Sequence, residues 1–281
     1  MRHIITILAL LAAIHATAQT NIWEGTTCGK HVELTPYLAE GDNNMAVIVC
    51  PGGSYFWHDM NAEGRQVAQW LQRNGISAFI LRYRTAQTPA FLLRYRHIFR
   101  GVRYPDALDD LRQAMRHVRS HAADYHINPS CLGVMGFSAG GHLVLSGAEL
   151  LPPADKPQFA AAIYPVVTMS AQCTHKRSRR ALMGESRVHD KALRDSLSME
   201  KRVDSSCPPI FLANCKDDPI VDYHNSELLD SALTANRIPH IYLQYSAGGH
   251  GFGASEEKGT AECREWKNEF LKWIQDPYKR Q

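Results

Sequence analysis

The sequence predicts an α/β fold in which a mostly parallel central sheet is covered by helices on both faces. Six short apolar runs, several of them nearly uninterrupted, are typical of strands buried on both faces. Segments of helical periodicity separate the runs, and such alternation favours a parallel sheet. The expected strands are residues 45–50, 76–83, 131–137, 159–165, 208–215 and 240–245, and the expected helices are residues 61–73, 104–121, 139–150, 222–236 and 254–275.

Turn-forming residues bound these elements. Asn74 and Gly75 end the first helix before the second strand, the pair at 128–129 opens the turn into the third strand, and Pro277 ends the last helix. Two stretches fit the alternation less well. They are residues 85–102 and 168–203, and we expect them to be insertions that shape a cleft.

Residues 1–18 have the features of a secretory signal peptide. Arg2 and His3 give a positive start, an apolar run covers residues 4–14, and small residues follow at 16–18. A buried N-terminal helix or a membrane anchor is the alternative, but a spanning helix needs about 20 apolar residues. We therefore expect cleavage after Ala18, export to the periplasm or the cell exterior, and a mature protein that is not held in a membrane.

The rest of the chain, residues 19–281, is expected to form a single domain. The composition is 44% hydrophobic and 21% charged, which is ordinary for a globular protein that buries a large core. The sequence contains no internal repeat, low-complexity tract or Pro/Ser-rich linker. One sheet with its helices accounts for this length.

The formal net charge is +3, and basic residues gather in two places. A nucleic-acid-binding patch is one interpretation, but neither group matches a nucleic-acid motif, so solvated loop charge is favoured. No nucleic-acid partner is expected. The first group is Arg94, Arg96, Arg100 and Arg103, and the second is Lys176, Arg177, Arg179 and Arg180.

The seven cysteines do not indicate a metal or redox centre. Their odd number forbids complete pairing, and no CxxC pair is present. Cys50, Cys131 and Cys215 lie beside apolar runs, where a thiol most often acts as a small buried hydrophobe.

A nucleophile is predicted at Ser138. After the apolar run CLGVMGF the chain reads GFSAGGHL, which has the GxSxG spacing. In this pattern a serine lies on a strained turn between strand and helix, and the glycines let neighbouring elements approach closely. The strand before the motif and the helical pattern after it supply the context that GxSxG alone lacks.

A serine hydroxyl needs a base to accept its proton, and His250 is the best of the 14 histidines. It lies in the glycine-rich segment SAGGHGFG, between the last expected strand and the last expected helix. His142, one helical turn beyond Ser138, is expected to pack or to hydrogen-bond locally.

The base needs a carboxylate to orient it, and the chain order Ser, Asp or Glu, His confines that residue to positions 139–249. The run NCKDDPIVD follows an expected strand, at the edge of the sheet where the sites of open α/β folds lie. Asp217 and Asp218 are both candidates on this ground.

Acyl transfer also requires donors for the developing oxyanion. The amide after the nucleophile, that of Ala139, is one candidate. The segment PGGSYFWHD follows the first expected strand, and its glycines free the backbone, so Gly53 and Ser54 are the other expected donors.

At these residues the chain resembles the bacterial acetyl xylan esterases and feruloyl esterases of the α/β-hydrolase superfamily. The similarity extends from about residue 45 to 273. It rests on PGGSY, RYPDALDDLRQAMRHVR, GFSAGGHL, CPPIFLANCKDDPIV and GGHGFG. Members commonly have an Asp followed three residues later by Val, which implies Asp218, with Val221, as the acid of the triad. Where many relatives have His before the glycines, this chain has Pro51, and Ser54 replaces a third Gly.

The resemblance implies a serine carboxylesterase that removes acyl groups, foremost acetyl, from xylan or its oligosaccharides without metal or organic cofactor. The features of residues 1–18 add the expectation that it is secreted. Tyr55, Phe56 and Trp57, beside the oxyanion loop, are candidates to stack on a sugar or narrow the acyl pocket, with simple packing as the alternative. Feruloyl ester cleavage, an exopeptidase-like activity and a non-catalytic binding function are the rival hypotheses. The oligomeric state is left open.

Overall fold

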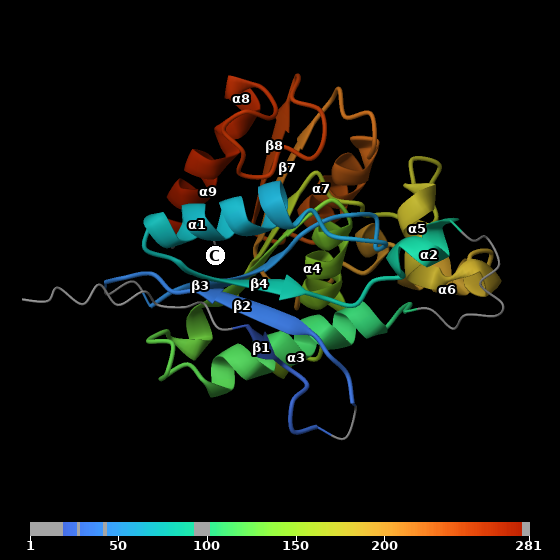
Figure 1. Ribbon diagram of the computed structural model, residues 1–281. Helices are drawn as coiled ribbons and strands as arrows, with labels where there is room; N and C mark the ends of the chain where they lie inside the picture. The colour runs from blue at the N-terminus through green and yellow to red at the C-terminus, as the bar shows by residue number, and fades with distance from the viewer. Residues whose placement is uncertain (1–18, 27–28, 42–43, 93–101, 277–281) are drawn as a thin grey trace, which may run out of the picture.

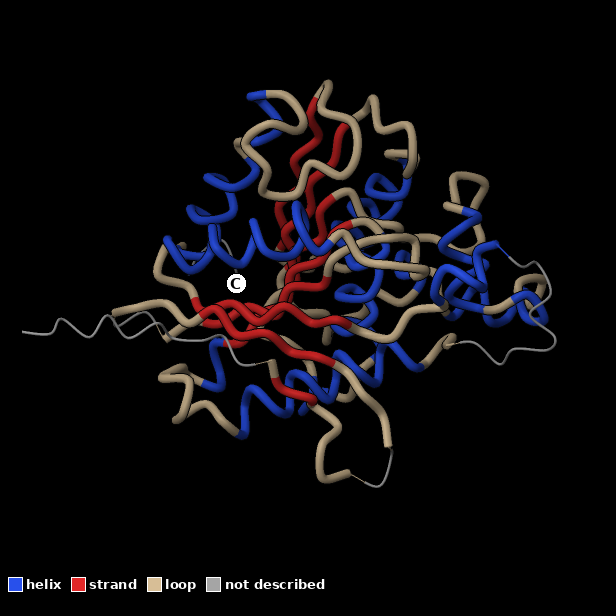
Figure 2. The backbone as a smooth tube through the Cα atoms, in the orientation of Figure 1, coloured by secondary structure: helices blue, strands red, loops and turns tan. Residues whose placement is uncertain are grey.

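The strands assemble into one eight-stranded sheet in the order β1-β2-β4-β3-β5-β6-β7-β8. The computed structural model describes residues 19–26, 29–41, 44–92 and 102–276. Figure 2 shows the strands side by side in this sheet. Strands β3 to β8 pair in parallel, whereas β2 pairs with β4, and β1 with β2, in antiparallel orientation. The bounds are β1 Thr20–Asn21, β2 Glu33–Tyr37, β3 Ala46–Cys50, β4 Ser77–Arg82, β5 Leu132–Phe137, β6 Ala160–Ile163, β7 Ile210–Cys215 and β8 His240–Tyr245. The predicted mostly parallel α/β sheet is confirmed.

Helices cover both faces of this sheet. Figure 1 shows α1 on one side of the sheet, with α9, and α3 and α4 on the other. The α-helices are α1 Gln66–Arg73, α2 Gln87–Leu92, α3 Asp106–Ser120, α4 Ala139–Leu150, α5 Lys176–Met183, α6 Lys191–Ser196, α7 His224–Ala235, α8 Ala261–Arg264 and α9 Trp266–Gln275. Short turns of other helical types are η1 Met60–Arg65, η2 Pro129–Cys131, η3 Pro153–Asp155, η4 Glu185–Arg187 and η5 Met199–Lys201.

The two faces of the sheet carry separate apolar cores because successive side chains of a strand point to opposite sides. In β3, Val47 and Val49 belong to the core under α1 and α9, whereas Ile48 and Cys50 belong to the core under α3, α4 and α7. All five residues of β3 are buried. The uninterrupted apolar runs in the sequence therefore have the cause that was predicted, which is burial on both faces.

The structure differs from the predicted elements in two places. Strands β1 and β2 were not predicted, because β2 is only partly buried, contains Pro36 and does not form an apolar run. The predicted helix over residues 254–275 is wrong in its first part, since α8 begins only at Ala261. Gly259 has a left-handed φ of 72°, and the Thr260 side chain caps α8, so the helix starts after a loop.

The two expected insertions contain α2, α5 and α6, which lie together on the side to which the arrow of β4 points (Figure 1). The predicted signal peptide at residues 1–18 lies outside the described residues, as do Arg94, Arg96 and Arg100 of the first basic group. The second group lies on α5, where Arg179 donates to the Met169 carbonyl and Arg180 pairs with Glu185. No helix within the described ranges is long and apolar enough to cross a membrane.

Candidate active site

Ser138 lies at the junction of β5 and α4 in a strained backbone conformation. Its φ and ψ are 54° and −117°, outside the regions that a side chain adopts readily. Only glycine fits at positions 136 and 140, two residues before and after the serine. A Cβ on Gly136 would lie 2.1 Å from the carbonyl oxygen of Gly140, and a Cβ on Gly140 would lie 2.0 Å from that of Cys50. The two glycines thus let the strand and helix approach closely and present the serine on the turn.

The structure brings together the three residues predicted from separate motifs. The Nε2 atom of His250 is 2.9 Å from the Oγ atom of Ser138. Its Nδ1 atom is 2.6 Å from the Oδ2 atom of Asp218. The Asp218 side chain is 1% exposed and that of His250 13% exposed. A hydroxyl, an imidazole and a buried carboxylate therefore form one hydrogen-bonded chain, the arrangement in which an imidazole can accept the hydroxyl proton.

In the acid loop after β7, the carboxylate of Asp218 bonds to the backbone of the residues that follow it. The Oδ1 atom of Asp218 accepts hydrogen bonds from the amides of Ile220 at 2.8 Å and Val221 at 2.9 Å. Its other oxygen is left for His250. Asp217 instead accepts from the amides of Gly248 and Gly249, so it holds the loop that carries the histidine. The geometry separates the two candidates, which residue reasoning alone did not.

The loop after β3 carries two of the expected oxyanion donors. Gly53 and Ser54 have positive φ values of 137° and 57°. Ser54 therefore adopts the left-handed conformation that a third glycine would adopt without strain. A Cβ on Gly52 would lie 2.8 Å from the Cβ of Ser138, so the loop passes directly beside the serine. The third expected donor, Ala139, supplies the first amide of α4, which has no acceptor inside the helix.

Two of the three aromatic residues expected to touch substrate are buried. Tyr55 and Phe56 are 3% and 1% exposed, whereas Trp57 is 38% exposed. The Tyr55 hydroxyl lies 2.8 Å from the Nδ1 atom of His142, whose Nε2 atom is 2.9 Å from the Leu197 carbonyl oxygen. His142 thus bonds locally, as predicted. Tyr55 and Phe56 are too enclosed to stack on a sugar, so the stacking hypothesis narrows to Trp57. A role of the three residues in narrowing the acyl pocket stays a prediction.

Glu63 and Tyr164, which lie behind the site, were not predicted from the sequence. Glu63 is 3% exposed and accepts hydrogen bonds from the Gly52 amide and the Tyr164 hydroxyl. A signal for Glu63 was available, since it shares an i, i+4, i+7 face with buried Val67 and Trp70. A carboxylate on an apolar face requires a partner. Tyr164 had no such signal within its apolar run.

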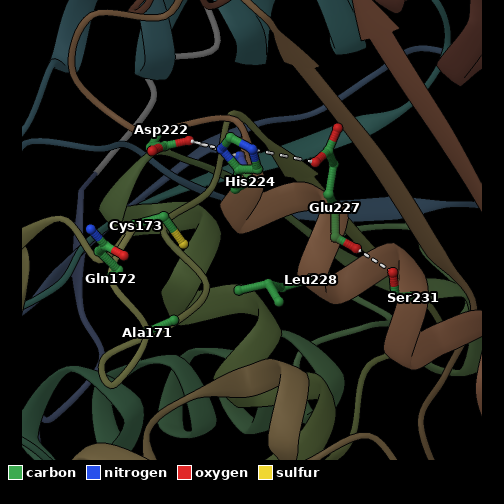
Figure 3. Close-up of a pocket in the computed structure, with 8 residues that line it drawn as sticks. All are labelled: Ala171, Gln172, Cys173, Asp222, His224, Glu227, Leu228 and Ser231. Atoms are coloured by element: carbon green, nitrogen blue, oxygen red, sulfur yellow. Dashed lines mark hydrogen bonds and ion pairs between the residues drawn. The ribbon is translucent and has the colours of Figure 1, made fainter.

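A surface pocket of about 760 Å³ begins next to the acid loop (Figure 3). Asp222 and Glu227 contribute carboxylates, and His224 lies between them. Its Nδ1 atom is 2.6 Å from the Oδ1 atom of Asp222, and its Nε2 atom is 3.9 Å from the Oε2 atom of Glu227. Cys173 and Leu228 line the opposite part. Over the described ranges, no group of three or more His, Cys, Asp or Glu side chains is arranged to hold a metal ion.

The chain is similar to known hydrolases. Residues 35–151 match the family described as BD-FAE, and residues 95–279 match the prolyl oligopeptidase family. The chain belongs to the prolyl oligopeptidase family of α/β hydrolases. A crystal structure of an acetyl ester-xyloside bifunctional hydrolase from Caldicellulosiruptor lactoaceticus is similar to this member over 92% of this chain and 95% of that chain, with 30% identity and a TM-score of 0.79.

Curated relatives of this family member include enzymes of xylan breakdown. An acetylxylan esterase from Xylanibacter ruminicola is 30% identical over 79% of this chain. An endo-1,4-beta-xylanase B from Butyrivibrio fibrisolvens is 28% identical over 85% of this chain. The chain spans only 44% and 38% of the length of these two relatives. By family and fold, the chain is an α/β hydrolase.

Proposed function

We propose that the protein is an exported esterase that removes acetyl groups from xylan or xylo-oligosaccharides through an acyl-enzyme on Ser138. The observation that carries this proposal is the hydrogen-bonded chain of Ser138, His250 and Asp218 beside a glycine-rich loop. The names of the acetylxylan esterase and the acetyl ester-xyloside hydrolase support the acetyl group and the sugar. The features of residues 1–18 support export, since a polymer is met outside the cytoplasm.

In the first step the Ser138 oxygen attacks the ester carbonyl while His250 accepts the hydroxyl proton. The carbonyl oxygen becomes an oxyanion, which the amides of Ala139 and of Gly53 or Ser54 stabilise. Asp218 stabilises the imidazolium that forms. Collapse of the intermediate expels the sugar oxygen, which takes the proton from His250, and leaves the acetyl group on the serine.

In the second step a water molecule replaces the sugar. His250 accepts a proton from this water, and the resulting hydroxide attacks the acyl carbonyl. The serine oxygen leaves and takes the proton back, so acetic acid is released and the enzyme returns to its starting state. Every proton transfer runs through His250, which faces Ser138 with one nitrogen and Asp218 with the other.

The nucleophile is tested by Ser138→Ala. Turnover of an aryl acetate should fall by at least roughly 10³-fold because no hydroxyl remains to form the acyl-enzyme. Ser146→Ala is a matched control. Ser146 lies on α4, the helix that begins directly after Ser138, and its hydroxyl bonds to the His142 carbonyl rather than to the site. A folded Ser138→Ala protein that retains more than a few per cent of wild-type activity would exclude Ser138 as the nucleophile.

The acyl group is tested by steady-state kinetics on acetyl, propionyl, butyryl and feruloyl esters of one alcohol. We expect kcat/KM to be highest for acetyl and to fall with each added methylene, because a pocket shaped for a methyl group excludes longer chains. Release of acetate from acetylated xylan tests the sugar. A kcat/KM that rises toward the feruloyl ester would show that the enzyme prefers feruloyl to acetyl groups. Cleavage of a peptide series without ester turnover would favour the peptidase alternative.

A further inference from the structure

Glu63 is a buried carboxylate that lies directly behind the loop expected to bind the oxyanion. Its Oε2 atom accepts the Gly52 amide at 2.7 Å, and its Oε1 atom accepts the Tyr164 hydroxyl at 2.9 Å. The side chain is almost fully enclosed, and no Lys or Arg of the described residues pairs with it. A buried carboxylate without a cation is costly to retain, which suggests a role beyond packing.

The hydrogen bonds of Glu63 continue to the loop that carries the histidine. The Tyr164 oxygen accepts the amide of Gly253 at 2.9 Å. The ring of Tyr164 also packs on that of His250, with 4.6 Å between the ring centroids. Glu63 and Tyr164 therefore join Gly52, in the oxyanion loop, to Gly253, three residues after His250.

Glu63 and His250 also interact electrostatically. Burial raises the pKa of Glu63 to about 7, while positive charge on His250 favours its ionised form and acts in the opposite direction. The interaction is mutual, so an ionised Glu63 also stabilises the imidazolium of His250. The other titratable groups that face Glu63 are Asp59, Tyr83 and Tyr164, which are acidic groups and supply no positive charge.

We propose that Glu63 is a positioning residue that holds the oxyanion loop and the His250 loop in register and stabilises positive charge on His250 during ester cleavage. This inference rests on the proposed acyl-enzyme mechanism. Asp218 stabilises the imidazolium through a direct hydrogen bond, whereas Glu63 acts through space and through Tyr164. Protonation of Glu63 as the pH falls through about 7 removes its charge and weakens the Tyr164 bond, so activity falls with it.

The test is the pH profile of kcat/KM for 4-nitrophenyl acetate, read at the wavelength where the phenol and phenolate absorb equally. In the wild-type enzyme the acid limb should fall more steeply than a single protonation allows, because Glu63 takes up a proton there in addition to the proton that inactivates any general base. Glu63→Gln should lower the plateau by about 10- to 100-fold through misplacement of the two loops. Its acid limb should have the slope of one proton.

Glu149→Gln is the matched control. Glu149 is also buried and its pKa is also raised by burial, but it lies near the end of α4 and has no hydrogen-bond partner within the described residues. This variant should keep both the wild-type plateau and the steep acid limb. If Glu63→Gln has an acid limb as steep as that of the wild type, a charge role for Glu63 is excluded, and an unchanged plateau excludes its role in positioning.

Tyr164→Phe separates the positioning role of Glu63 from the role of its charge. It also tests the proposal if Glu63→Gln does not fold. It removes the hydroxyl between Glu63 and Gly253 but leaves the carboxylate. The plateau should fall while the acid limb remains steep. A one-proton limb in Tyr164→Phe would overturn the assignment of the second proton to Glu63. Failure of the acyl-enzyme mechanism is seen separately, as activity that survives Ser138→Ala.

Discussion

Two adjacent aspartates at the end of β7 have different tasks in this site. Asp218 uses one carboxylate oxygen for the amides of its own loop and the other for His250. Asp217 uses its carboxylate for two glycine amides in the histidine loop. The two carboxylates therefore bond to different groups, although the residues are neighbours in sequence.

Replacement of each aspartate by asparagine should separate these tasks. We expect Asp218→Asn to lower kcat by roughly 10³- to 10⁴-fold, because an amide can favour the wrong tautomer of His250 and does not stabilise the imidazolium. Asp217→Asn keeps an oxygen acceptor for Gly248 and Gly249 and should cost much less. Steady-state kinetics of the two purified proteins decide the matter, and the opposite ranking would transfer the acid role to Asp217.

At the scale of secondary structure, the site depends on how closely α4 approaches the end of β3. The helix contains three glycines, of which Gly140 faces the carbonyl oxygen of Cys50 and Gly147 faces the side chain of Leu111. Backbone cannot move aside without displacing the strand, whereas the end of a leucine side chain can rotate. Glycine is therefore required at position 140, whereas position 147 accepts a larger residue.

Gly140→Ala and Gly147→Ala form a matched pair for this difference. In Gly140→Ala the new Cβ would lie 2.0 Å from a backbone oxygen, so we expect a loss of about 1–3 kcal/mol in unfolding free energy and reduced turnover. In Gly147→Ala the nearest atom is the Cδ2 of Leu111, at 2.8 Å, and alanine favours a helix interior by about 1 kcal/mol over glycine. Urea denaturation followed by circular dichroism gives both values, and equal losses would contradict the close-approach argument.

Across the whole molecule, a buried carboxylate adds to the strand pairing that binds the N-terminal segment to the rest of the fold. Asp110 on α3 is 0% exposed. Its Oδ1 atom accepts the indole N–H of Trp23 at 2.9 Å, and its Oδ2 atom accepts the amide of Arg84 at 2.9 Å. The guanidinium of Arg84 also bonds to Asp110 and to Asp106. This cluster joins the segment after β1, the end of β4 and α3.

Asp110→Ala should therefore destabilise the whole fold. Removal of the carboxylate leaves the guanidinium of Arg84 and the indole of Trp23 without this acceptor, which should cost about 3 kcal/mol of unfolding free energy. Asp109→Ala is the control on the same helix, because Asp109 forms a partly exposed pair with Arg112, which is expected to contribute less than about 1 kcal/mol. Similar unfolding midpoints in urea for the two variants would show that the buried cluster does not hold the segment.

The residues of the site divide according to how far their signals extend along the chain. Ser138 could be predicted because its glycines, strand and helix lie within one continuous segment. His250 and the acid loop could be placed because each follows an apolar run and chain order restricted the search. The bond between Tyr164 and Glu63 joins residues 101 positions apart, and no pattern of either segment refers to the other. The burial of Tyr55 and Phe56 was likewise not readable, since side-chain direction in an irregular loop depends on its surroundings.

The sequence by itself determined the parallel sheet, its helices and the three motifs that form the hydrogen-bonded chain. These follow from local periodicity and from turn residues, whose conformational preferences act within a few positions. The resemblance implied Asp218 as the partner of His250, whereas only the tertiary structure decided which aromatic side chain remains exposed and how Glu63 is enclosed. The tertiary structure also decided that β1 and β2 form an antiparallel edge of the sheet. Partly buried β2 is stabilised by pairing with β4 rather than by an apolar run of its own. Such outcomes depend on contacts between distant segments, which exist only after the sheet has formed.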